Sequence, residues 1–129
     1  MKKIDQFVIE GGKPLNGSVV SSGAKNAALK LIAASVLTYK SVIIQNVPHI
    51  QDVFIMIELL TGMGAKVSWS GISSLKITCE NLDLDKLDQV KIGHMRGSVV
   101  LIGPLVARFK KLKFHEPGGC LIGARPITT

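Results

Sequence analysis

Two segments of the chain are apolar around almost the whole circumference of a helix, and they restrict the fold more than any other feature. The first covers residues 27–37 and is interrupted by Lys30, and the second covers residues 99–107 and is interrupted by Gly103 and Pro104. A helix with so little polar surface belongs in the interior of a protein. Both segments are shorter than the roughly 20 residues that span a bilayer. The sequence therefore predicts buried helices of a globular α/β domain rather than a membrane protein.

The predicted elements follow the same order twice. They are, in chain order, a helix over 25–37, a strand over 41–47, a helix over 52–63, hairpin strands over 66–69 and 75–78, a helix over 95–109 and a strand over 111–115. The second long helix is expected to be reset at Pro104. Lys25 and Arg96 open the two apolar helices 71 residues apart, and Ser41 and Lys111 open the following strands 70 residues apart. This agreement predicts a duplicated structural unit whose second copy is cut short.

Two further regions complete the predicted organisation. Short extended runs at 7–10 and 18–21 flank Asn16-Gly17, a dipeptide typical of hairpin turns. The polar connection 80–89 holds four of the nine acidic residues and is the expected seam of the chain.

The charge is concentrated in the last third of the chain. Residues 1–90 carry nine basic and eight acidic side chains, a net charge of +1, whereas residues 91–129 carry seven basic side chains against one acidic, a net charge of +6. This basic third suggests an anionic partner. A nucleic-acid-binding module is one alternative, but the six aromatic residues form no stacking platform, so no salt-dependent mobility shift with nucleic acid is expected.

The cysteines and the N-terminus indicate a cytoplasmic protein. Cys79 and Cys120 fit no disulfide framework and no zinc spacing, so both are expected to be thiols. The basic residues near Met1 are followed by no apolar core of a signal peptide. Cys79 lies in an alternating strand pattern and is interpreted as a packing residue.

Lys25, Asn26 and Arg96 are the first candidate binding residues. Lys25 and Asn26 follow a run of small residues into the first turn of a helix, where free N–H groups and an ammonium favour an anion. Arg96 opens the second apolar helix and is suited to bind a carboxylate or phosphate. On spacing alone, a capped helix with a solvated lysine and a salt-bridged arginine explain these residues at least as well.

The segment 117–126, Pro-Gly-Gly-Cys-Leu-Ile-Gly-Ala-Arg-Pro, holds the second candidate site. Gly118 and Gly119 permit backbone conformations closed to other residues, so the segment can approach a ligand closely. Arg125 is near enough to Cys120 in sequence to lower the pKa of its thiol or to hold an anion beside it. The alternative is a small residue in a tight turn.

Three segments together resemble the UDP-N-acetylglucosamine 1-carboxyvinyltransferases, the MurA enolpyruvyl transferases of bacterial peptidoglycan synthesis. They are residues 22–29 (SGAKNAAL), residues 95–98 (MRGS) with 103–108 (GPLVAR), and the cysteine segment 117–126. The cysteine segment is specific and separates the chain from the related enolpyruvyl-shikimate-phosphate synthases. The resemblance extends over essentially the whole chain to Pro126.

The resemblance implies a fold of two similar domains, each an inside-out α/β barrel with its helices buried and its sheets outside. It implies a longer family chain, of which this one is the N-terminal part. Residues 1–22 would pair with the missing C-terminal domain, and residues 23–129 would form one full repeat plus the start of a second.

The implied reaction transfers the enolpyruvyl group of phosphoenolpyruvate to the 3-hydroxyl of UDP-N-acetylglucosamine and releases phosphate, with no cofactor or metal. Lys25 would contact phosphoenolpyruvate and Asn26 the sugar. Arg96 and Arg125 would bind the anionic substrates, Arg125 at the phosphate of phosphoenolpyruvate. Cys120 would deliver a proton to the methylene carbon, and it corresponds to the cysteine that fosfomycin alkylates in the family.

The activity of the 129-residue chain by itself is a separate question. The acidic base and further arginines of the C-terminal domain are absent, so the chain alone is expected not to turn over. The alternative to a working part of the transferase is an inactive, truncated remnant that keeps some substrate contacts.

Overall fold

The structure, a computed structural model, describes residues 6–118. Its elements are α1 (Lys25–Ala34), the 3-10 turn η1 (Ser35–Leu37), β1 (Val42–Ile44), α2 (Gln51–Gly62), β2 (Lys66–Trp69), β3 (Leu75–Thr78), the 3-10 turn η2 (Leu84–Lys86), α3 (Gln89–His94), the 3-10 helix η3 (Arg96–Leu101) and α4 (Ile102–Phe109). No helix among these described residues is both long enough and apolar enough to cross a bilayer.

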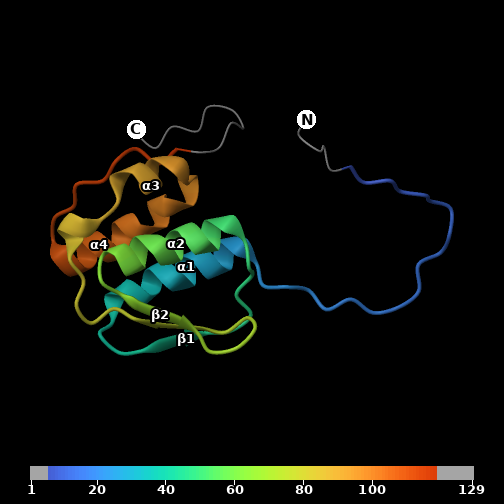
Figure 1. Ribbon diagram of the computed structural model, residues 1–129, viewed down its shortest axis with the longest axis horizontal. Helices are drawn as coiled ribbons and strands as arrows, with labels where there is room; N and C mark the ends of the chain where they lie inside the picture. Colours follow the sequence, from blue (N-terminus) through green and yellow to red (C-terminus); the bar gives the residue numbers. More distant parts are fainter. Residues whose placement is uncertain (1–5, 119–129) are drawn as a thin grey trace.

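The elements form three layers (Figure 1). An antiparallel sheet of order β1-β3-β2 lies on the outside, α1 and α2 form the middle layer, and α3, η3 and α4 lie on the side away from the sheet. The predicted α/β class is confirmed, with helices between a sheet and a further helical layer.

The central strand β3 shows why the sheet faces the helices. Leu75 and Ile77 are fully buried, while Lys76 between them is exposed, because successive side chains of a strand point to opposite faces. Ile77 pairs with Val42 on one side and with Val67 on the other. The hairpin predicted over 66–69 and 75–78 is confirmed at both strands.

Helix α2 supplies the largest part of the core. Val53, Met56, Leu59 and Leu60 recur at helical spacing and are fully buried. The helix ends where Gly64 adopts φ 108°, a conformation that favours glycine. The predicted helix over 52–63 is therefore confirmed within one residue.

Helix α1 is buried on one face only. Ala28, Leu29, Ile32 and Ala33 are buried, whereas Leu31 is 53% exposed. The expectation of a helix covered on all sides is therefore wrong for the described residues, because no element among them covers the outer face of α1. The helix predicted over 25–37 is otherwise confirmed, with its last three residues tightened into η1.

The second apolar helix begins differently from the prediction. Residues 96–101 form the 3-10 helix η3, and the α-helix begins at Ile102. The reset therefore lies before Pro104, which sits in the first turn of α4, where a missing N–H leaves no helical hydrogen bond unmade.

Three predicted strands are not present. Residues 7–10 and 18–21 are extended and exposed, with Phe7 97% and Val20 95% accessible, and they run away from the helices in Figure 1. Residues 111–115 form no ladder either. A strand requires a hydrogen-bonded neighbouring strand, and no described strand pairs with any of these three.

Helix α3 was not predicted. The polar connection was expected to cover residues 80–89, and no helix or strand was expected over residues 90–94. Asp88 caps this short helix: its carboxylate accepts from the backbone N–H groups of Val90 and Lys91, both at 3.0 Å. An Asp at the N-cap is the signal in the sequence that could have revealed the helix.

Candidate functional site

Lys25 is the first residue of α1, and its ammonium is paired rather than free. Its Nζ lies 3.0 Å from Oδ2 of Asp52, an acidic residue in the first turn of α2. The two side chains are 51% and 33% exposed, so the pair remains accessible to water. Asn26, the next residue, is exposed. The structure thus places both predicted substrate contacts at the start of α1, where solutes can reach them.

The approach to α1 is shaped by a close backbone contact. A Cβ added to Gly23 would lie 1.6 Å from the carbonyl oxygen of Asn46, so only glycine fits there. Asn46 itself adopts φ 56°, a left-handed conformation that asparagine tolerates better than most residues. The segment before Lys25 is thereby seated against the loop that follows β1.

A small hollow of about 200 Å³ opens beside this contact. Its lining comes from the start of α1 and from the end of β1 with the following loop: Gly23, Ala24, Ala27, Ala28, Leu31, Ile44, Gln45, Asn46 and Val47. The hollow is mostly apolar and contains no charged side chain, so it does not by itself resemble an anion site.

Arg96 is the first residue of η3 and is half-buried. Helix α1 packs directly on η3. A Cβ added to Gly97 would lie 2.9 Å from Cδ1 of Leu29, one helical turn beyond Lys25. The structure therefore brings the elements that begin with Lys25 and Arg96 into contact.

The cysteine segment is described only at its beginning. Pro117 is buried, and a Cβ added to Gly118 would lie 2.1 Å from the carbonyl oxygen of Gly93, three residues before Arg96. Its first residues therefore lie against the end of α3. Cys120 and Arg125 lie outside the described residues.

Cys79 is a packing residue, as predicted. It is fully buried, and burial raises the pKa of its thiol, opposed by its hydrogen bond with Ser35 and by the charge of Arg108. A buried, protonated thiol is a poor nucleophile.

Part of the basic third of the chain is engaged in internal contacts. Lys91 pairs with Glu58 at 2.8 Å. Arg108 donates to the carbonyl oxygens of Val36 at 2.8 Å and Glu80 at 2.9 Å. These two cations stabilise the fold, which weakens the case for a continuous basic surface.

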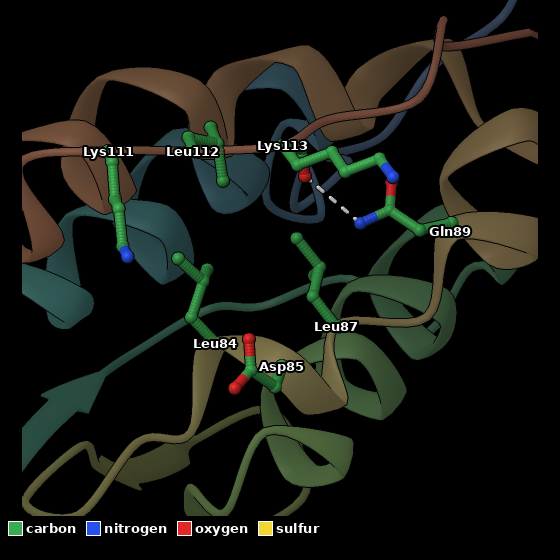
Figure 2. Close-up of a pocket in the computed structure, with 7 residues that line it drawn as sticks. All are labelled: Leu84, Asp85, Leu87, Gln89, Lys111, Leu112 and Lys113. Carbon is green, nitrogen blue, oxygen red and sulfur yellow. Dashed lines mark hydrogen bonds between the residues drawn. The ribbon is translucent and has the colours of Figure 1, made fainter.

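One groove was not foreseen from the sequence (Figure 2). It has a volume of about 530 Å³ and is lined by Leu84, Asp85, Leu87, Gln89, Lys111, Leu112 and Lys113. Its two walls come from segments more than 20 residues apart, so no local motif marks it. At one end, the amide of Gln89 donates to the carbonyl oxygen of Lys113 at 3.0 Å.

Comparison with known proteins gives a consistent family. Residues 9–129 match the family EPSP synthase (3-phosphoshikimate 1-carboxyvinyltransferase). The chain is 43% identical over 124 residues to the UDP-N-acetylglucosamine 1-carboxyvinyltransferase of Coxiella burnetii, with 96% of the chain and 29% of the relative covered. It is 44% identical over 124 residues to the Campylobacter hominis enzyme of the same name, with 96% of the chain and 30% of the relative covered.

A solved structure supports the same fold. The crystal structure of the enolpyruvyl transferase NikO from Streptomyces tendae matches with a TM-score of 0.65 at 28% identity, over 76% of this chain and 23% of that one. The chain thus spans less than a third of the length of the relatives it matches. With nearly all of its length matched, this chain belongs to the EPSP synthase family of enolpyruvyl transferases, and it is similar to the UDP-N-acetylglucosamine 1-carboxyvinyltransferases within it.

Proposed function

We propose that the chain is the N-terminal part of a UDP-N-acetylglucosamine 1-carboxyvinyltransferase and carries the cysteine side of its active site. The observation that supports this most strongly is the packing of α1 on η3, because it joins the elements that begin with Lys25 and Arg96. Gly118 lies against Gly93 in the turn before Arg96, so the segment leading to Cys120 reaches the same part of the fold.

The proposed chemistry needs positive charge and one acid. Addition of the sugar 3-hydroxyl to C2 of phosphoenolpyruvate forms a tetrahedral ketal, with Cys120 as the acid that protonates the methylene carbon and the acidic base of the C-terminal domain as the acceptor of the hydroxyl proton. Loss of a proton from the resulting methyl group to a base, together with departure of phosphate, then gives the enolpyruvyl product. Lys25, Arg96 and Arg125 would balance the charge of the phosphate and carboxylate groups, an electrostatic role that cations held in place perform well. Asn26 would hydrogen-bond the sugar.

Asp52 fits this scheme as the residue that holds Lys25 in place. In its absence a lysine in the first turn of a helix would sample many rotamers, and a fixed ammonium loses less entropy when an anion binds. The ion pair is partly exposed, so phosphoenolpyruvate can reach the ammonium without displacing buried structure.

The remaining length of the enzyme is the proposed partner. Residues 7–20 include six large apolar side chains that are at least 82% exposed: Phe7, Val8, Ile9, Leu15, Val19 and Val20. Helix α1 also exposes the apolar side chains of Ala27, Leu31 and Ala34 on a face that no other described element covers. We assign these surfaces to contacts with the rest of the transferase, residues 1–22 with the C-terminal domain, in the cytoplasm where its soluble substrates are found.

Fosfomycin tests the assignment. The chain would be continued by the corresponding C-terminal length of the Coxiella burnetii relative, and this protein is called the joined enzyme below. Mass spectrometry of its peptides should show a covalent adduct on Cys120 and none on Cys79. An adduct on Cys79 alone, or none after prolonged exposure with UDP-N-acetylglucosamine present, would contradict the proposal.

A further inference from the structure

The side chain of Gln89 acts on the chain segment 113–115 as a neighbouring strand would. Its Nε2 donates to the carbonyl oxygen of Lys113 at 3.0 Å, the bond drawn in Figure 2, and its Oε1 accepts from the backbone N–H of His115 at 2.7 Å. The carbonyl before Phe114 and the N–H after it are the pair that a parallel strand engages. One primary amide thus replaces one residue of a missing strand.

The same helix makes two more contacts with this segment. Gly93 lies four residues after Gln89, so both are on one face of α3. A Cβ added to Gly93 would lie 3.5 Å from Cδ2 of His115, and one added to Gly118 would lie 2.1 Å from the carbonyl oxygen of Gly93. Residues 113–118, which we call the stem, therefore follow α3 along one helical turn.

The residues that lead into the stem and begin it, 111–115, are held on their apolar side by the hydrophobic core. Leu112 and Phe114 are partly buried and pack against the hydrophobic core, while Lys111, Lys113 and His115 are exposed. Packing of Leu112 and Phe114 determines which side of the segment faces the core, but it provides no hydrogen-bond partner for the backbone groups of the segment. Within the part of the chain that the structure describes, Gln89 supplies the side-chain hydrogen bonds that fix the position of the stem along α3.

We infer that Gln89 is a positioning residue that anchors the stem, and hence the root of the cysteine segment, on α3. Gly118 precedes Cys120 by two residues, and His94 at the end of α3 precedes Arg96 by two. Helix α3 therefore couples the placement of both segments. The consequence for proton transfer by Cys120 rests on the proposed function, whereas the anchoring itself does not.

Amide hydrogen exchange in the 129-residue chain tests the anchor directly. A hydrogen bond contributes about 0.5–1.5 kcal/mol net, so Gln89→Ala should speed exchange of the His115 N–H by about 2- to 13-fold. Exchange at Leu59, in the core of α2, should not change. The matched control is Gln51→Ala, which removes an exposed glutamine from the first position of α2 and should leave His115 unaffected.

Gln89→Glu adds a pH signature that a residue serving only as filler would not show. The protonated carboxyl has an O–H to donate to Lys113 and a C=O to accept from His115, whereas the ionised form loses that donor and sets a negative oxygen against the carbonyl oxygen of Lys113, which moves the segment away from α3. Protection of His115 relative to the wild type should therefore rise as the pH falls through about 4.3, the ordinary glutamate pKa. Parallel measurement of the wild type accounts for the other charged and ionisable groups around position 89, which are Asp85, Asp88, Lys111, Lys113, His115 and Glu116.

The two results decide the inference. Unchanged exchange of His115 in Gln89→Ala, or a pH profile of Gln89→Glu that parallels the wild type, would overturn it. Neither measurement uses turnover or fosfomycin, so failure of the anchor and failure of the proposed function are observed separately.

Discussion

Lys25 and Asp52 join the first turns of α1 and α2 through an ion pair of 3.0 Å between Nζ and Oδ2. A pair with side chains this exposed contributes little to the stability of a fold, typically about 0–1 kcal/mol. The pair lies at the start of α1, which packs against the element that begins with Arg96, and under the proposed function its ammonium contacts phosphoenolpyruvate.

Lys25→Met should therefore separate stability from activity. We expect the free energy of unfolding in urea to change by less than about 1 kcal/mol. Phosphate release by the joined enzyme should fall by about 100-fold or more, the usual cost of removing one preorganised electrostatic group. Lys40→Met, at an exposed position in the turn before β1, is the control and should change neither quantity appreciably. Equal losses in the two variants would refute the role of Lys25.

Gly23→Ala should destabilise the chain strongly. The added Cβ would lie 1.6 Å from a backbone oxygen of Asn46, and neither backbone can move aside without disturbing β1 or α1. We expect a loss of more than about 2 kcal/mol in urea unfolding, followed by the fluorescence of Trp69. Gly62→Ala is the matched control: it lies in the last turn of α2, and the nearest atom to its added Cβ is the carbonyl oxygen of Lys86 at 3.9 Å, an ordinary contact, so it should stabilise by roughly 0.5–1 kcal/mol. Similar losses in the two variants would show that the contact at Gly23 is not as tight as described.

Arg108 should matter for stability and not for substrate binding. Its guanidinium donates to the carbonyl oxygens of Val36 and Glu80 and lies 4.5 Å from the centre of the Tyr39 ring. Arg108→Met should lower the free energy of unfolding by about 2 kcal/mol, the scale of hydrogen bonds from a charged donor. Lys111→Met, at an exposed position, should change it by less than about 0.5 kcal/mol.

Cys79 should give the stability a dependence on alkaline pH. Burial raises the pKa of its thiol in the folded state above that in the unfolded chain. The resulting stabilisation is complete below the ordinary thiol pKa of about 8.5 and is lost as the pH rises through the raised value. Between pH 7.5 and 10 the wild type should lose more unfolding free energy than Cys79→Ala. Parallel profiles would show that the thiol pKa of Cys79 is the same in the folded and the unfolded chain.

The sequence predicted those elements whose own side chains carry the signal. Helix α2 and the hairpin of β2 and β3 were placed to within one residue, because Met56 and Leu60 recur at helical spacing and Leu75 and Ile77 alternate. Helix α3 was missed because six residues carry too little periodicity, and only Asp88 marks its start. The extended runs in residues 6–21 form no strands because no described segment pairs with them.

The site was predicted in part for the same reason. Lys25 and Arg96 stand at the starts of two apolar helices, which the sequence shows, and the structure brings those helices into contact. The pairing of Lys25 with Asp52 and the bonds from Gln89 to the stem join residues 24 to 27 positions apart, and no local pattern encodes such contacts. The substrate contacts of Lys25, Asn26, Arg96 and Arg125 and the proton transfer by Cys120 all stay predictions.

Phosphate release from phosphoenolpyruvate and UDP-N-acetylglucosamine tests the central claim most directly. The chain alone should give only background, since the proposal assigns it one side of the active site, and the joined enzyme should turn over and lose that activity in Cys120→Ala. Clear turnover by the 129-residue chain alone, or none by a folded joined enzyme, would contradict the proposal that this chain is the cysteine-bearing part of the transferase.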